Sequence, residues 1–170
     1  YDLVVFHASL HHFSNLDQLF KDKIIPALKD NGCLFINEYV GANRFQFPKK
    51  QIQTINSALD IIPKEYKVRG ATNLVKNKFY GNGLFRVYLA DPSESVSSAN
   101  ILDTVYNYFN VVEERSFGGN ILMSVFKDIA YHFVDLNTEK QTILNNLFKI
   151  EDDYLKENKP DFLIGFYQKK

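Results

Sequence analysis

The chain opens on a short apolar run that leads directly into small and ionisable residues. Leu3 to Phe6 is continuous in apolar side chains, and the histidines His7, His11 and His12 follow it closely. A run of this length without polar alternation predicts a strand that is buried on both faces in a parallel sheet. Open α/β sheets bind their ligands at the carboxyl ends of such strands. We therefore expect a polar crevice at the end of this first strand.

The rest of the pattern predicts alternating helices and strands. Stretches with apolar residues at helical spacing are separated by shorter apolar runs. In chain order, the pattern predicts a helix at 14–28, a strand at 33–39, helices at 48–62 and 91–109, a strand at 109–117, helices at 121–133 and 138–154, and a strand at 161–167. The first strand, helix and second strand fit within about 40 residues, so these two strands are expected to run parallel.

Several residues have expected places within these elements. Asp91 is expected to cap the helix that follows it, with Glu94 reaching back to the cap. Val111 and Val112 are expected inside, and Glu151 is expected on the polar side of the last long helix.

Residues 42–91 differ from the rest of the chain. They carry Gly70, Gly81 and Gly83 and only one clear helical stripe. A connection of about 50 residues between two sheet elements is longer than ordinary loops. We therefore expect a single domain, 1–170, in which 42–91 is an insertion that covers the crevice as a cap or lid.

Charge and composition exclude several classes of protein. The chain carries 20 basic and 20 acidic residues, which gives no net field for binding nucleic acid or anionic lipid. No apolar run reaches the roughly 20 residues of a membrane span, and no signal-peptide pattern is visible. The single cysteine, Cys33, rules out an internal disulfide framework and suits a reducing compartment. We therefore expect a cytoplasmic protein that binds no nucleic acid and does not span a membrane.

Several strings resemble, in their order and spacing, the carboxyl-terminal half of class I S-adenosylmethionine-dependent methyltransferases. Residues 1–5 and 9–12 resemble the fourth strand of that family and its loop, and 28–38 resemble the turn into its fifth strand. The strings that resemble a bacterial subgroup linked to saccharide or small-molecule methylation are 38–41, 43–46, 91–96 and 118–119. The resemblance implies an incomplete Rossmann-like sheet, strands four to seven with flanking helices, whose last strand is antiparallel and lies beside the fifth.

The resemblance also implies S-adenosylmethionine as the cofactor of the full-length protein. The family's glycine-rich loop follows its first strand, and its ribose-binding acidic residue ends the second. Neither has a counterpart in this sequence, and the pair Gly81 and Gly83 follows no predicted strand. We expect the chain to be the second half of a larger domain, and we expect it to bind the cofactor poorly by itself.

The polar ends of the first two strands supply the candidate catalytic residues. His11 is the expected general base, because an imidazole that titrates near neutrality can take a proton from a hydroxyl or an amine as the methyl group arrives. Glu38 ends the second strand and is expected to orient the substrate or the catalytic histidine. Adjacent side chains in extended backbone point in opposite directions, so only one of His11 and His12 is expected to face the cavity.

The remaining candidate residues contact the cofactor and the acceptor. The tip of the first strand is expected beside the methyl donor, with contacts from His7, Ala8 and Ser9. A small-molecule or saccharide acceptor is expected to contact His12, Tyr39, Arg44, Tyr80 and Arg86.

Other functions are weighed against this interpretation. No metal is expected, because no carboxylate or cysteine lies near the three histidines in the sequence. Ser9 does not fit a hydrolase nucleophile, since the elbow motif requires glycines where His7 and His11 stand. A non-catalytic α/β interaction module, forming a homodimer through the exposed edge of the first strand, stays open, as does a nicotinamide-dependent oxidoreductase.

Overall fold

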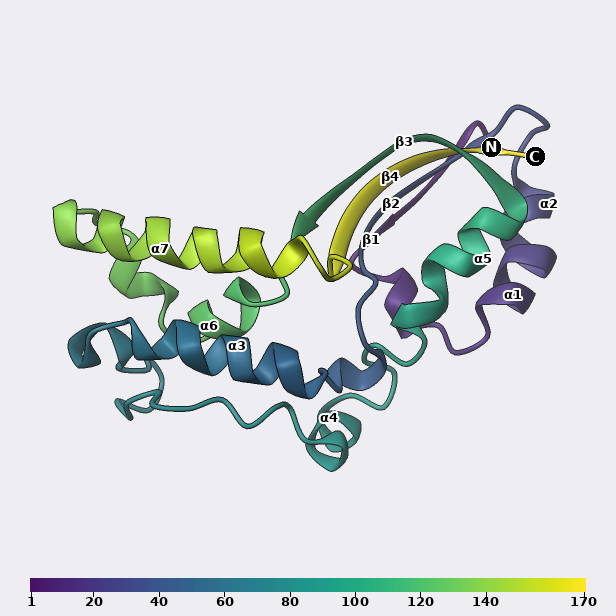
Figure 1. Cartoon of the computed structure of the whole chain (residues 1–170). Coiled ribbons are helices and arrows are strands. Elements are labelled where there is room, and N and C mark those ends of the chain that lie inside the picture. The colour runs from purple at the N-terminus through teal and green to yellow at the C-terminus, as the bar shows by residue number, and fades with distance from the viewer. The chain divides into compact units, whose positions relative to one another are not determined.

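The computed structural model describes all 170 residues, which divide into two units (Figure 1). The first unit comprises Tyr1–Gln46, Asn82–Phe117 and Pro160–Lys170, and the second comprises Phe47–Gly81 and Gly118–Lys159. The predicted insertion at 42–91 therefore contributes to both units, and its role as a lid stays a prediction.

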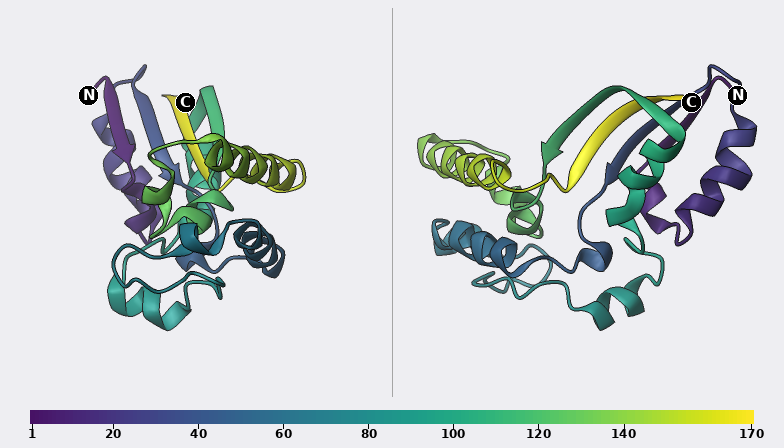
Figure 2. Two further views of the ribbon diagram at one scale, coloured as in Figure 1. Left: turned by 90° about the vertical axis from the view of Figure 1, so that its left-hand side faces the viewer. Right: turned by 45° about the vertical axis from the view of Figure 1, so that its right-hand side comes forward.

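A four-stranded mixed sheet organises the first unit. Its strand order is β1-β2-β4-β3, which the left panel of Figure 2 shows as a series from purple through blue and yellow to green. β1 runs parallel to β2, and β4 runs antiparallel to β2. The strand bounds are Leu3–His7 for β1, Cys33–Tyr39 for β2, Phe109–Gly118 for β3 and Phe162–Lys169 for β4. All four predicted strands form, and the last one is antiparallel beside the second, as expected.

Helical segments cover one face of this sheet. The predicted helix at 14–28 consists of α1 (Leu16–Leu19), a π-helical segment (Phe20–Ile24) and α2 (Ile25–Ala27). The wider π turn suits Pro26, because proline lacks the N–H of a regular helix and its ring would clash with the carbonyl four residues earlier. The other helices of the unit are α4 (Leu84–Ala90) and α5 (Ile101–Tyr108).

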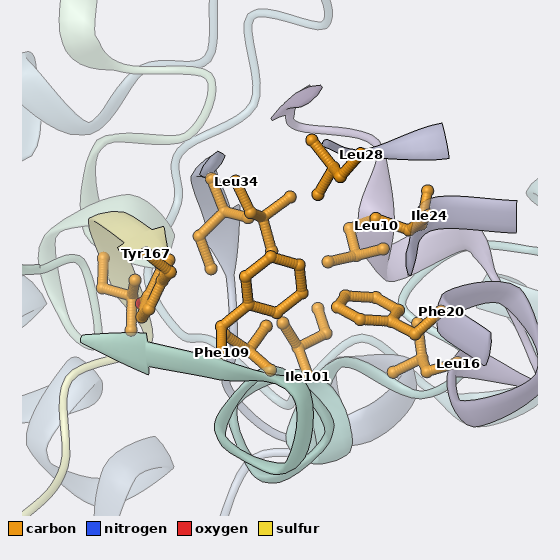
Figure 3. Close-up of a cluster of buried hydrophobic side chains, with 12 residues drawn as sticks. Leu10, Leu16, Phe20, Ile24, Leu28, Leu34, Ile101, Phe109 and Tyr167 are labelled. Carbon is orange, nitrogen blue, oxygen red and sulfur yellow. The ribbon is translucent and has the colours of Figure 1, made fainter. Parts of the chain in front are cut away.

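The core of the first unit lies between the helices and this face of the sheet (Figure 3). Alternate side chains of β2 and β4 point into it, since strand side chains alternate between faces. The buried side chains that form this core are Leu10, Leu16, Phe20, Ile24, Leu28, Leu34, Ile36, Ile101, Val105, Phe109, Leu163 and Tyr167.

β1 forms where the apolar run predicts it, but it is not buried on both faces. Val4 and Phe6 pack against the core, whereas Leu3 and Val5 are 46% and 55% exposed. β1 is an edge strand whose only neighbour in the sheet is β2. The prediction of full burial was wrong because a continuous apolar run favours a strand without determining what covers each of its faces.

Two further predictions for the first unit were wrong. Val111 and Val112 in β3 are both exposed rather than inside. The helix expected from residue 91 begins only at Ile101. Asp91 instead accepts the backbone N–H of Ser93 at 2.8 Å, which closes a local turn rather than a helix.

Three helices form the second unit. They are α3 (Lys49–Asp60), α6 (Leu122–Phe126) and α7 (Thr138–Leu155). Each contacts the other two, and the helices predicted at 48–62 and 138–154 are confirmed. The helix expected over 121–133 is shorter, because it ends at Phe126 and only a 3₁₀ turn, Ala130–Phe133, follows. None of the helices in the chain combines the length and the apolar character that crossing a membrane requires.

Two buried charged side chains form hydrogen bonds with the backbone at the two ends of α6. Glu151 was predicted on the polar side of α7, but it is buried. Its carboxylate accepts the N–H groups of three successive residues, Asn120, Ile121 and Leu122, at 2.8–2.9 Å. At the other end, the Lys76 ammonium donates to three backbone carbonyls at 2.6–3.1 Å, and burial lowers the pKa of Lys76 to about 8. A negative charge at the start of a helix and a positive charge at its end both interact favourably with the helix dipole.

Short 3₁₀ turns connect these elements. They are Leu10–His12, Asn43–Phe45 and Ser98–Asn100 in the first unit, and Lys64–Lys67 in the second. The first of them holds two of the candidate histidines.

Candidate functional site

The carboxyl ends of β1 and β2 lie side by side in the first unit. Their parallel register pairs His7 with Asn37, and the N–H of Ala8 continues the ladder by donating to the Asn37 carbonyl at 2.9 Å. Ala8 itself has a φ of +47°, which turns the chain sharply after the strand. This turn carries the following residues, including His11, over the end of β2.

Glu38 anchors this turn from β2. Its side chain is buried, and its Oε1 accepts the backbone N–H groups of Ser9 and Leu10, each at 2.7 Å. Its Oε2 lies 2.7 Å from Nδ1 of His11. An ionised carboxylate can only accept hydrogen bonds, so Nδ1 of His11 carries the proton. In the neutral imidazole of His11 the lone pair is then on Nε2, where it can accept a proton or bind a metal ion.

The Glu38 carboxylate is stabilised in its ionised form. Burial alone would raise the pKa of Glu38, but the hydrogen bonds from His11, Ser9 and Leu10 outweigh burial and hold that pKa below its ordinary value. These hydrogen bonds therefore stabilise the folded protein most at pH values at which Glu38 is ionised.

This shift predicts acid sensitivity. Because the pKa of Glu38 is lower in the folded state, its stabilising contribution is full above the ordinary value of 4.5 and is lost as pH falls through the lower folded value. In urea unfolding, Glu38→Gln should be less stable than the wild type at pH 6, and the difference should narrow steadily below pH 4.5. A difference that stays constant between pH 6 and pH 3 would contradict this account.

A second series of hydrogen bonds, through Ser93 to Asp91, positions His12. Asp91 accepts a hydrogen bond from the Ser93 hydroxyl at 2.6 Å, and Nδ1 of His12 lies 2.9 Å from the same hydroxyl oxygen. Since the Ser93 proton is directed to Asp91, the Ser93 oxygen accepts the Nδ1 proton of His12. In the neutral imidazole of His12 the lone pair is likewise on Nε2.

Glu94 faces the free side of His11. Its Oε1 lies 3.5 Å from Nε2 of His11 and accepts the Ser95 hydroxyl at 2.9 Å. Arg44 holds this segment in place, because its guanidinium donates to the Glu94 carbonyl at 3.2 Å and to the Pro92 carbonyl. Residues 91–95 are thus fixed against the turn at the end of β1.

The two histidine rings lie against each other. Their centroids are 4.3 Å apart, and both histidines belong to the 3₁₀ turn Leu10–His12 rather than to an extended strand. The expectation that they point in opposite directions was therefore wrong, since it assumed a strand geometry that ends at His7.

Comparisons with known proteins find distant structural neighbours. No family model matches the chain, and no curated protein matches it. One solved structure, the plantazolicin methyltransferase BpumL in complex with SAH, matches with 13% sequence identity and a TM-score of 0.32, covering 100% of this chain and 52% of that chain. The plantazolicin methyltransferase BamL, in complex with a triazolic desmethylPZN analog and SAH, matches with 13% identity and a TM-score of 0.30, covering 99% and 53%. The chain thus spans about half the length of these neighbours, and similarity this weak adds nothing to the reasoning from its residues.

The structure brings together some of the predicted acceptor-binding residues. His12 lies beside His11 and Glu94, and these three residues form the histidine cluster. Arg44 donates a hydrogen bond to the Glu94 carbonyl. Tyr39 is buried and donates to the Ala42 carbonyl at 2.9 Å, and burial raises its pKa. Arg86 is exposed on α4, and Tyr80 belongs to the second unit, where it is 82% exposed. Contact of these residues with an acceptor stays a prediction.

Asp91, Ser93 and Glu94 were not predicted as site residues. The pattern around them predicts the start of a helix, and a helix start gives no indication that their side chains meet the histidines. The one signal in the sequence was the string 91–96, which carries part of the family resemblance.

Proposed function

We propose that the chain forms part of an S-adenosylmethionine-dependent methyltransferase that acts on a small molecule or a saccharide. The observation that carries the proposal is the pair His11 and Glu38 at the adjacent carboxyl ends of parallel strands, where open α/β sheets bind their ligands. The strand order β1-β2-β4-β3, with β4 antiparallel to β2, supports it. This is the arrangement that the sequence resemblance implies for strands four, five, seven and six of an incomplete Rossmann-like sheet.

The pair has the geometry of an oriented general base. When bound, S-adenosylmethionine supplies a methyl group on a positively charged sulfur. His11 would accept at Nε2 the proton that the acceptor hydroxyl or amine loses, as the methyl group leaves the cofactor sulfur, which would keep the electron pair of the broken carbon–sulfur bond. Glu38 fixes the Nδ1–H tautomer of His11 and stabilises the imidazolium that forms, as a buried carboxylate does behind a catalytic histidine. General-base assistance of this kind contributes about 10²- to 10⁴-fold in rate.

The tip of β1 offers a partial fit for the cofactor. The N–H groups of Ala8 and Ser9 are already bound to Asn37 and Glu38. Together with His7, these residues can therefore line one wall of a cofactor site but cannot supply the free N–H groups of a glycine-rich loop. We expect residues outside this chain to bind the methionine end, and we expect this chain alone to be inactive.

The test is methyl transfer by the complete gene product that contains this chain. Incubation with S-adenosylmethionine labelled in its methyl group, and with a panel of hydroxyl, amine and saccharide acceptors, should give labelled product. A titration of the 170-residue chain alone with S-adenosylmethionine should show no saturable binding. The absence of transfer to any acceptor and of S-adenosylmethionine binding by the complete product would overturn the proposal. Tight binding by the chain alone would overturn only the expected role of outside residues.

A non-catalytic interaction module is the second candidate, and one observation favours it. β1 pairs on one side only, and it exposes Leu3 and Val5 on its outer face. Such an edge can pair with the edge of a second copy. On this alternative, sedimentation would give a dimer that Val5→Lys converts to a monomer, and the histidine cluster would have no bearing on any activity.

A further inference from the structure

Three potential metal ligands converge at the end of β1. They are one ring nitrogen each from His11 and His12 and a carboxylate oxygen of Glu94, and all three atoms lie within 4.8 Å of one another. We propose that His11, His12 and Glu94 bind one divalent transition-metal ion, with Zn²⁺ as the preferred ion. This site could not be expected from the sequence, because Glu94 lies more than 80 residues away from the histidines.

Both histidines are oriented for metal binding. Each uses Nδ1 to donate to a polar partner, His11 to Glu38 and His12 to Ser93. In its neutral form each then has its lone pair on Nε2, and neutral imidazole is the form that binds metal ions. A histidine ligand that donates its other ring N–H to a carboxylate is the usual arrangement behind a zinc ion. Glu38 supplies that carboxylate from a buried position.

The separation between His11 and Glu94 fits a tetrahedral ion, and all three ligand atoms lie within 4.8 Å of one another. With metal–ligand bonds of about 2.1 Å, two ligand atoms of a tetrahedral site lie about 3.4 Å apart. The separation of 3.5 Å between Nε2 of His11 and Oε1 of Glu94 is close to this value and long for a direct hydrogen bond. The side chains of His12 and Glu94 are about one-third exposed, so small rotations of these two side chains can complete the approach.

The ligand set indicates the kind of ion. Two imidazoles and one carboxylate suit Zn²⁺ and its neighbours in the first transition row better than Mg²⁺ or Ca²⁺, which prefer oxygen ligands. Three protein ligands leave a fourth position open, which is the pattern of zinc sites that bind water or a substrate. The partial exposure of His12 and Glu94 leaves that position accessible.

Metal binding and the role of His11 as a base exclude each other. Both use the lone pair on Nε2 of His11, so a bound ion prevents His11 from accepting a proton. Zinc should therefore inhibit the proposed methyl transfer, and this consequence alone rests on the proposed function. The binding itself does not, because it requires neither S-adenosylmethionine nor an acceptor.

The test is a titration of the protein with ZnCl₂ by isothermal calorimetry, and with CoCl₂ by visible absorption. We expect one equivalent of Zn²⁺ to bind, and we expect Co²⁺ to give the intense bands of four-coordinate geometry. Glu94→Gln and His12→Gln should each weaken binding by at least about tenfold, because each removes one of three ligands. Glu38→Gln should weaken it by about 10- to 100-fold while leaving the stoichiometry unchanged, because Glu38 positions His11 without touching the ion.

The matched control is His132→Gln. His132 belongs to the second unit and bonds to the Val68 carbonyl, so its loss should leave zinc affinity unchanged. Circular dichroism establishes that each variant is folded, and Glu94→Gln changes only a partly exposed side chain. Failure of the wild type to bind Zn²⁺, or equal affinity of Glu94→Gln and His132→Gln, would overturn the proposal. Zinc binding without any methyl transfer would instead refute the proposed function and leave the metal site standing.

Discussion

Replacing His11 by Gln should lower kcat for methyl transfer by about 100-fold or more, because glutamine cannot accept the proton that the acceptor loses. Glutamine preserves much of the size and polarity of the side chain, and Leu10 and Ser9 keep their bonds to Glu38. KM for the acceptor should therefore change much less than kcat. The measurement is the rate of labelled methyl transfer by the complete gene product, with EDTA present so that no metal ion occupies Nε2.

The control for this measurement is again His132→Gln, which removes a histidine outside the cluster and should keep full activity. A His11→Gln enzyme with wild-type kcat would eliminate His11 as the base. A variant that loses S-adenosylmethionine binding instead of kcat would assign His11 to the cofactor site.

Replacing Glu151 by Ala should lower the free energy of unfolding by about 3 kcal/mol or more, because each buried N–H group that loses its acceptor costs about 1–3 kcal/mol. The carboxylate accepts three successive N–H groups at the start of α6. In the alanine variant these donors lose a buried acceptor. Urea unfolding followed by circular dichroism measures the change.

Asp152→Ala provides the comparison, since Asp152 is the next residue of α7 and is exposed. Its effect should stay within about 0.5 kcal/mol. Equal destabilisation by the two substitutions would show that Glu151 acts only through the helical character of α7. Glu151→Gln should fall between them, because an amide keeps one acceptor oxygen.

The main elements of the fold could be predicted from the sequence. The apolar runs at Leu3–Phe6 and 33–39 form β1 and β2, and the helical stripes at 48–62 and 138–154 form α3 and α7. These elements follow from local periodicity, which depends only on neighbouring residues. The antiparallel placement of β4 beside β2 came from the family resemblance, since periodicity carries no information about strand order.

Burial was predicted less well than element type. Leu3 and Val5 were expected inside but are exposed, whereas Glu151 was expected outside but is buried. An apolar residue on a strand lowers the free energy only if another part of the chain covers it, and a charged residue can be buried if its hydrogen bonds are satisfied. Both conditions depend on residues that are distant in the sequence.

The candidate site likewise combines residues that local pattern predicts with residues that only distant contacts bring in. The sequence by itself determined that His11 closely follows the first strand and that Glu38 lies at the end of the second, and parallel pairing then brings the two strand ends to the same edge of the sheet. Only the tertiary structure decided that Asp91, Ser93 and Glu94 complete the cluster. The segment that carries them is held by single hydrogen bonds, such as those of Arg44 to its backbone, rather than by a repeating pattern. Contacts of this kind leave no periodic signal in a sequence, so the residues that this segment contributes to the site could not be predicted.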